Sequence, residues 1–477
     1  MSTEIIYPKI IQGGMGIYIA NPQGARSVSM NGQQGTVSGV TAERIVTRLL
    51  QNGDPNGDIR RALSHFPFPL YAEKVIQKYY VEGGIPKDAP YKGVPFFSVD
   101  PPASLISLNI CSVYALVWLA KEGHSNPISI NFLEKVSMPL IYGILGAMLA
   151  DVDFITMGAG IPLKIPEVIN AILENRVVTY PVSVIGYQRA NWTHLMCFNP
   201  EEFFGEKMPQ MKKPGFIPII SSVFFASLFI TELPEGSVYG FIVEESTAGG
   251  HNAPPKGKPI LNEQGIPLPI YGPRDKVDYA KMVEFGLPFW IGGSYASPEK
   301  LKWALSVGAQ GIQVGSIFAL AEEFGMDAAI SRTIRKNGFN NQQKVRTDMR
   351  ISPTGYPFKV AVVDGTISQD EVYLNRERVC SQGGLIVPYE KEDGSIGYRC
   401  PAEPVKKYTD KGGDIKDTIG RGCLCNGLLG AAALGDYIEP SVATIGDDVT
   451  FLPDLMVNEN SSYTTKDAID YLLSYAA

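Results

Sequence analysis

The sequence predicts an α/β fold, a (β/α)8 barrel with insertions and a C-terminal extension. Short apolar runs alternate with amphipathic stretches over residues 9–336. The 49 glycines and 35 prolines fall between these runs, as they do in many βα turns. The run Ser297-Pro298-Glu299 gives a cap residue, a first-turn proline and an acid, which is a specific signal for a helix start.

The expected strands are almost wholly apolar, as parallel strands are when both of their faces are covered. In order along the chain they are 9–12, 34–38, 128–132, 153–157, 217–221, 238–243, 288–291 and 311–314. Helical patterns lie between them, at 41–51, 139–150, 165–174, 276–285 and 298–307. A doubly wound open sheet shows the same alternation, so periodicity alone leaves both topologies open.

The organisation beyond the strands is also suggested by composition. Two stretches, near 52–95 and 180–215, fit no βα unit, and we interpret them as insertions on the barrel. The alternation stops after residue 336. We therefore expect a barrel over 1–336 and an attached C-terminal region, rich in cysteine, over 337–477.

The charge balance excludes several classes of protein. The chain has 42 Lys and Arg against 49 Asp and Glu, with no basic block, which argues against a nucleic-acid groove. The longest apolar runs fall short of the roughly 20 residues that a membrane span needs. The first residues carry no apolar signal segment. We expect a cytoplasmic protein with neither nucleic acid nor membrane as a partner.

Glycines at the seventh and eighth expected strands suggest an anion site. Gly292 and Gly293 end the seventh strand, and Gln313 is followed by Gly315 and Ser316 at a helix start. Glycine lets backbone N–H groups approach an anion, and a helix N-terminus adds partial positive charge. Phosphate is commonly held after these two strands in such barrels. Tight βα turns are the alternative interpretation.

Small and polar residues also follow the other expected strands. A flat tricyclic ring needs glycines beside its face and a few amide or hydroxyl partners at its polar edge. The candidates for such contacts are Gly13, Gly14, Met15, Asn131, Gly158, Gly160, Ser222, Gly249 and Gly250.

His251 is the candidate catalytic residue. It lies after the sixth expected strand, in a glycine-rich loop where Gly249 and Gly250 precede it. An imidazole at a strand's carboxyl end can serve as a general base or acid near neutral pH. A histidine that only caps loop backbone is the alternative.

Several motifs together resemble the nitronate monooxygenase family, formerly called 2-nitropropane dioxygenase, which includes FMN-dependent enoyl-ACP reductases. They are Ile-Ile-Gln-Gly-Gly-Met at 10–15, Ile-Asn at 130–131, Gly-Ala-Gly at 158–160, Ala-Gly-Gly-His at 248–251, Gly-Gly at 292–293 and Gly-Ala-Gln-Gly-Ile-Gln-Val-Gly-Ser at 308–316. The resemblance implies a TIM barrel with FMN. It also implies that His251 is catalytic, that Gly293, Gln313, Gly315 and Ser316 hold the phosphate, and that Gly14, Met15 and Asn131 contact the ring.

The resemblance implies a flavoprotein oxidoreductase that oxidises alkyl nitronates with O2, with the loop histidine as base. An enoyl-thioester reductase of fatty acid or polyketide synthesis, with NAD(P)H as electron donor, uses the same motifs and remains an alternative. A non-catalytic flavin-binding subunit is a second alternative. The expected partners are a small-molecule or acyl-thioester substrate and, as one option for assembly, a second copy in a homodimer.

Four cysteines crowd the C-terminal region. Four thiolates there could hold Zn or an iron–sulfur cluster. Their spacing lacks the paired Cys-x-x-Cys pattern of zinc ribbons, so buried free thiols are the competing interpretation. They are Cys380, Cys400, Cys423 and Cys425.

Overall fold

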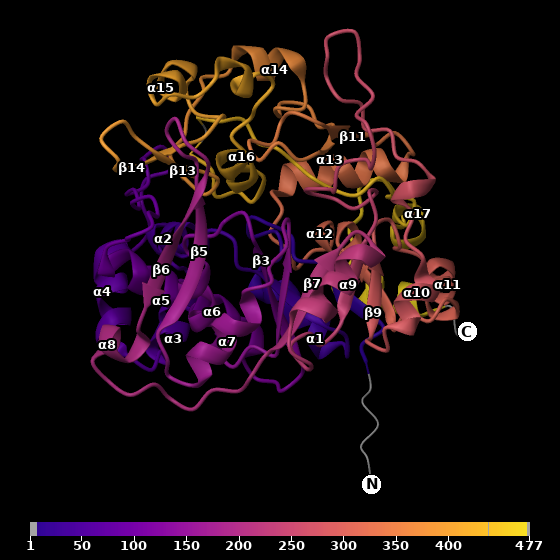
Figure 1. The fold of residues 1–477 in the computed structure, drawn as a ribbon. Helices are drawn as coiled ribbons and strands as arrows, with labels where there is room; N and C mark the ends of the chain where they lie inside the picture. Colours follow the sequence, from indigo (N-terminus) through magenta and orange to yellow (C-terminus); the bar gives the residue numbers. More distant parts are fainter. Residues whose placement is uncertain (1–6, 437, 475–477) are drawn as a thin grey trace.

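The computed structural model describes residues 7–436 and 438–474, and its centre is a sheet of eight parallel strands (Figure 1). The hydrogen-bonded order is β1-β10-β9-β8-β7-β4-β3-β2. β1 and β2, at the two ends of this order, also meet. The Gln12 N–H donates to the carbonyl of Gln34 at 2.9 Å, and the Gln34 N–H donates to Ile10 at 3.1 Å. The sheet thus closes into a barrel, which confirms the predicted fold and excludes the open sheet. Its strands are β1 (Ile10–Gln12), β2 (Gly35–Ser38), β3 (Ile128–Leu133), β4 (Phe154–Gly158), β7 (Gly215–Ile220), β8 (Phe241–Glu244), β9 (Phe289–Gly292) and β10 (Gly311–Val314).

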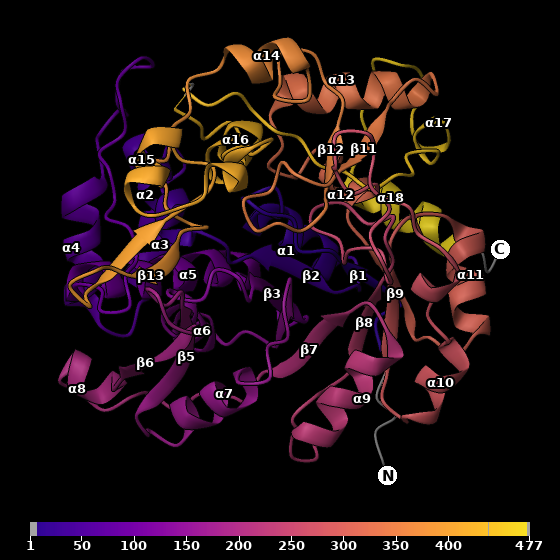
Figure 2. The ribbon, with the colours of Figure 1, turned by 45° about the horizontal axis from the view of Figure 1, so that its top comes forward.

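Helices surround the barrel (Figure 2). Four of them, α1, α5, α9 and α13, fall outside the helical patterns expected from the sequence. α1 contains glycine and serines, which are poor helix formers, although Asn21 caps it by accepting from the Gly24 N–H at 2.8 Å. α5 and α9 are apolar on most sides and show no amphipathic pattern. The helices that follow barrel strands are α1 (Pro22–Met30), α2 (Ala42–Gln51), α5 (Ala103–Lys121), α6 (Leu140–Leu149), α7 (Ile165–Leu173), α9 (Val223–Glu232), α10 (Tyr279–Glu284), α11 (Pro298–Ser306), α12 (Ser316–Ala319) and α13 (Ala328–Phe339).

α5 is, by length and composition, the one helix among the described residues that could cross a membrane. It packs instead against α1, α2, α3, α4 and α6, and 83% of its most apolar window is buried. Its polar residue Asn109 donates to Glu43 Oε2 at 3.0 Å, inside the fold. α5 is therefore built as a core helix, which passes the same test of length and hydropathy.

The amino-terminal end of the barrel is filled by aromatic side chains. Trp290 is fully buried and donates from Nε1 to the carbonyl of Pro8 at 2.7 Å. Tyr7 lies edge-on to Trp290 and to Tyr239, with ring centroids 6.0 and 6.1 Å apart. Such edge-to-face packing buries large apolar rings in favourable geometry. Aromatic side chains thus pack together at this end of the barrel.

The stretches interpreted as insertions hold elements outside the barrel. Residues 52–95 contain α3 (Asp58–Ser64) and α4 (Pro69–Tyr79), which pack on α5. The second stretch contains an antiparallel hairpin of β5 (Val178–Val184) and β6 (Trp192–Phe198), then α8 (Pro200–Phe204).

The C-terminal region lies over the carboxyl end of the barrel and returns to its side (Figures 1 and 2). Its last helix, α18, packs against α1, α11 and α12, beside the first and seventh barrel units. α18 thus covers the side where an eighth helix would lie, since α12 has only 4 residues. The region contains β11 (Val345–Asp348), β12 (Phe358–Ala361), α14 (Asp370–Asn375), β13 (Val387–Glu390), β14 (Ile396–Arg399), α15 (Val405–Asp410), α16 (Leu424–Ala431), α17 (Leu452–Leu455) and α18 (Thr465–Leu473).

We predict that Leu472→Ala destabilises the whole protein. Leu472 is 0% exposed on α18, so removing its side chain leaves a cavity between the C-terminal helix and the barrel. Such changes cost about 2–5 kcal/mol. The measurement is the denaturant midpoint. Leu374→Ala, at a leucine that is 76% exposed, is the matched control and should leave the midpoint unchanged. Equal midpoints for the two variants would contradict the packing described for α18.

Candidate active site

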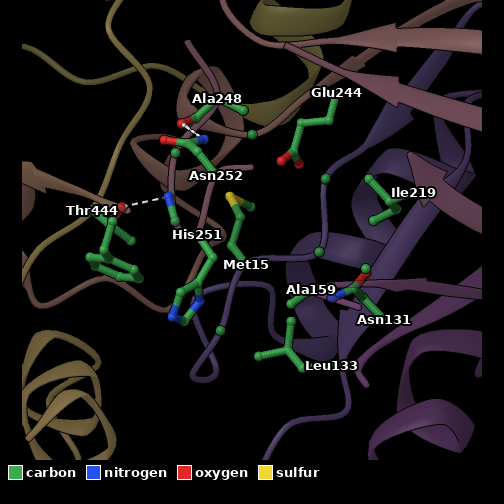
Figure 3. A pocket seen from close by; sticks show the side chains of 18 of the residues that line it. Met15, Asn131, Leu133, Ala159, Ile219, Glu244, Ala248, His251, Asn252 and Thr444 are labelled. Carbon is green, nitrogen blue, oxygen red and sulfur yellow. Dashed lines mark hydrogen bonds between the residues drawn. The ribbon is translucent and has the colours of Figure 1, made fainter. Parts of the chain in front are cut away.

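A cavity of about 870 Å³ opens at the carboxyl ends of the barrel strands (Figure 3). This volume lies within the range of ligand-binding pockets. Every predicted cofactor-binding residue except Gly292 lines it, and so does His251. Gly292 lies on β9 itself, where a side chain would meet the Gln313 amide at 3.4 Å. The lining residues from the prediction are Gly13, Gly14, Met15, Asn131, Gly158, Gly160, Ser222, Gly249, Gly250, Gly293, Gln313, Gly315 and Ser316.

Two glycines on the cavity wall are required by the geometry. A Cβ on Gly14 would stand 2.1 Å from the Cβ of Asn131, so only glycine lets the β1 loop pass this side chain. Gly293 has φ +105°, a conformation that other residues rarely adopt. A Cβ on Gly293 would also lie 3.0 Å from Thr247 Oγ1. The wall therefore keeps bare backbone on the cavity side at both positions.

The cavity floor carries three polar side chains. Asn131 accepts from Thr156 Oγ1 at 3.0 Å through Oδ1, which orients its amide. Gln313 Nε2 is buried and has no hydrogen-bond partner among the described residues. Burial raises the pKa of Glu244 to about 8, so this carboxyl is mostly protonated at neutral pH. An unpartnered buried donor costs free energy, which a ligand with acceptors would recover.

The predicted phosphate residues lie together at the ends of β9 and β10. Gly293 and Gly315 line the cavity there, and Ser316 begins α12. Ser316 Oγ accepts from the Gly446 N–H at 2.8 Å, which brings the C-terminal region to the same corner. Thr247 Oγ1 is buried nearby and has no hydrogen-bond partner in the part of the chain that the structure describes. The corner thus offers backbone N–H groups and hydroxyls to an anion.

His251 contacts the C-terminal region directly. Its Nε2 lies 2.7 Å from Ser352 Oγ, and its ring packs edge-on to Phe358 with centroids 4.9 Å apart. Burial, together with the charge of Lys135, lowers the pKa of His251 to about 4. The imidazole is therefore neutral at pH 7 and can accept a proton. Its Nδ1 has no hydrogen-bond partner in the described part of the chain.

The C-terminal region forms the roof of the cavity, which the sequence motifs do not indicate. The roof residues lie in loops and short elements after β11. In this part of the chain strands and helices do not alternate, so the sequence pattern does not identify these residues. Glu244 was detectable in principle, because it is an acid at the end of an apolar strand. The roof residues are Tyr356, Phe358, Gly384, Leu385, Leu424, Cys425, Leu428, Thr444, Ile445, Gly446 and Asp448.

The C-terminal cysteines do not form the predicted metal site. Within residues 7–436 and 438–474, no three His, Cys, Asp or Glu side chains converge as metal ligands. All four are free thiols, and only Cys425 lines the cavity. Burial raises the pKa of each, to about 12 at Cys425, so they are protonated at neutral pH. The prediction of zinc or an iron–sulfur cluster at Cys380, Cys400, Cys423 and Cys425 is therefore not upheld.

Comparison with known proteins gives likeness of fold only. No protein-family model and no curated protein sequence matches the chain. Among solved structures, FabK from Thermotoga maritima aligns with TM-score 0.47 and 13% identity, over 99% of this chain and 93% of that one. Nitroalkane oxidase from Streptomyces ansochromogenes aligns with TM-score 0.45 and 12% identity, over 98% and 96%. The enoyl reductase domain of MlnA from Bacillus amyloliquefaciens aligns with TM-score 0.38 and 10% identity, over 77% and 66%.

We predict that Glu244→Gln changes how stability depends on pH. The folded pKa of Glu244 lies near 8 and the ordinary value is 4.5, so the folded protein holds an extra proton between these values. The contribution of this residue to stability therefore falls as pH rises, by up to about 1.4 kcal/mol per unit. Glu244→Gln lacks this pH-dependent loss of stability. Its free energy of unfolding should therefore rise relative to that of the wild type between pH 5 and 8. Parallel stability curves for the two proteins, measured by urea unfolding, would contradict the buried neutral carboxyl.

Proposed function

We propose that this protein is an FMN-dependent oxidoreductase that oxidises alkyl nitronates with O2, with His251 as the proton acceptor. The observation that carries the proposal is the neutral imidazole of His251, with Nδ1 unpartnered, in a glycine-walled cavity that ends in an anion corner. The resemblance of the motifs at 10–15, 248–251 and 308–316 to nitronate monooxygenases supports the same assignment.

The residues of the cavity fit FMN. Gly293, Gly315 and Ser316 would hold the phosphate, and the bare backbone at Gly13 and Gly14 would lie beside the ring. The unpartnered Gln313 Nε2, the Asn131 amide and the protonated Glu244 would serve the polar edge, which needs both donors and acceptors. When bound, FMN supplies the electron transfer that none of these side chains can perform.

The chain's own residues would handle the substrate and its proton. His251 accepts the α-proton of a neutral nitroalkane at Nδ1, because the imidazole is unprotonated at neutral pH. Lys135 lines the cavity and acts electrostatically on His251, so it attracts an anionic nitronate and disfavours a lasting imidazolium. Phe358 and Leu385 in the roof exclude water from this space.

A second candidate is an enoyl-thioester reductase with NAD(P)H as electron donor. The observation that favours it is the apolar rim of the cavity, where Phe224 is 69% exposed and Ile161 is 44% exposed. Such a rim suits an acyl chain. Protonation of the substrate by His251 would need an imidazolium, which its low pKa opposes, whereas oxidation of an alkyl nitronate, already deprotonated, needs none. For this reason we place the nitronate reaction first.

We predict that the purified protein binds FMN and that an alkyl nitronate bleaches its absorbance in the absence of oxygen. The reductase alternative predicts bleaching by NADH or NADPH instead. The measurement is anaerobic mixing with each compound, followed near the visible maximum of the flavin. Protein that carries no flavin and binds none on titration would contradict both functions.

We predict that His251→Asn lowers kcat/KM for a neutral nitroalkane by roughly 10²- to 10⁴-fold, the usual contribution of a general base. Turnover of the preformed nitronate should fall much less, because the α-proton has already been removed from this substrate. His194→Asn on β6, outside the cavity, is the matched control. Equal losses for both substrates would remove proton abstraction from the role of His251.

A further inference from the structure

We propose that Ser352 is the positioning residue for His251: its hydroxyl accepts the Nε2–H and so leaves Nδ1 as the proton acceptor in the cavity. This inference rests on the proposed role of His251. It assigns a function to the C-terminal region, because Ser352 lies 101 positions after the histidine, beyond the predicted barrel.

The contact is short, buried and part of a small network. Ser352 is 0% exposed, and its Oγ lies 2.7 Å from His251 Nε2. The same Oγ lies 2.7 Å from Thr354 Oγ1 and accepts from the Thr354 N–H at 3.2 Å. The hydroxyl therefore has three polar neighbours.

Counting hydrogens leaves two arrangements. One lone pair of Ser352 Oγ is taken by the Thr354 N–H. Its single proton then points either to Thr354 Oγ1 or to His251 Nε2. In the first arrangement Nε2 carries the hydrogen and donates to Ser352, while Nδ1 keeps its lone pair. In the second arrangement the hydrogen is on Nδ1, so this nitrogen has no lone pair with which to accept a proton in the cavity. Either hydroxyl of the Ser352–Thr354 pair can donate. When Thr354 Oγ1 accepts the serine proton, the Ser352 oxygen is left to accept from Nε2, which is the arrangement that we propose.

The segment that carries Ser352 is fixed to the histidine loop by backbone hydrogen bonds. The Lys359 N–H donates to the carbonyl of Gly250 at 2.9 Å, and the Asn252 N–H donates to Pro357 at 3.0 Å. These bonds flank His251 on both sides, and Phe358 packs against its ring. The orientation of the imidazole is thereby set from outside its own loop.

A serine in this place differs physically from a carboxylate. A carboxylate beside Nε2 would stabilise the imidazolium and raise its pKa. In the described part of the chain, the only charged group that shifts the pKa of His251 is Lys135, and it lowers that pKa. The neutral hydroxyl fixes the tautomer without adding charge, so a proton taken at Nδ1 is readily passed on.

The test is the tautomer of His251, read by nitrogen-15 NMR of histidine-labelled protein at pH 7 without flavin or substrate. The chain has only 4 histidines, and His251→Asn identifies the signal. Wild type should show the Nε2–H tautomer. Thr354→Val removes the acceptor of the serine proton and should shift His251 toward Nδ1–H. Ser352→Ala should leave a mixture of both tautomers.

Ser112→Ala is the matched control, because Ser112 is also 0% exposed but its hydroxyl has no hydrogen-bond partner within residues 7–436 and 438–474. It should leave the His251 signals unchanged. With a neutral nitroalkane, Ser352→Ala should lower kcat/KM about 5- to 30-fold, the worth of one buried hydrogen bond. An Nδ1–H tautomer in wild type, or an unchanged tautomer in Ser352→Ala, would overturn the proposal. Because the NMR arm needs no turnover, its outcome is independent of whether the proposed reaction is correct.

Discussion

The pairing of residues 352–361 with the histidine loop is the interaction on which the site depends. Two backbone hydrogen bonds, from Lys359 to Gly250 and from Asn252 to Pro357, join a late segment of the chain to the end of the sixth barrel strand. They cover an opening that the barrel alone would leave to solvent. They also hold Phe358 against the His251 ring and so contribute to its burial. The covered side of the cavity and the neutral histidine thus both depend on this contact.

Burial shifts the pKa values of two groups on the cavity lining, Glu244 and His251, in opposite directions. It raises the pKa of Glu244 and lowers that of His251, because partial loss of hydration disfavours the charged form of each. At neutral pH both are then uncharged. The charged side chains that remain on the lining are Lys135, Lys256 and Asp448, and Asp448 forms an ion pair with Lys300. A cavity of this kind suits a flat neutral ring beside a small anion.

The barrel and its ligand face could be predicted from the sequence because both depend on local patterns. Apolar runs identify the strands, and parallel strands bring their carboxyl ends together whatever else the chain does. Gly14, Asn131 and His251 therefore fall at one cavity although they are far apart in sequence. The roof could not be predicted in this way. Ser352 meets His251 through a contact between distant segments, and no local pattern encodes such a contact.

Two other differences have equally physical reasons. Helices α5 and α9 escape detection because they are apolar on most sides, so no 3.6-residue period distinguishes their buried face. The four C-terminal cysteines suggested a metal because of their number. The four thiols lie near enough to act electrostatically on one another, but no three of them are placed as metal ligands in the described chain. Cys400, Cys423 and Cys425 are buried, and Cys380 is half-buried.

The central claim is that the glycine-walled cavity holds FMN beneath the C-terminal roof. The most direct test is a crystal structure of the protein grown with FMN. The account predicts ring density beside Gly13 and Gly14, phosphate density between Gly293 and Ser316, and His251 still on Ser352. Density for FMN elsewhere on the molecule, or none in a cavity filled by water, would contradict it.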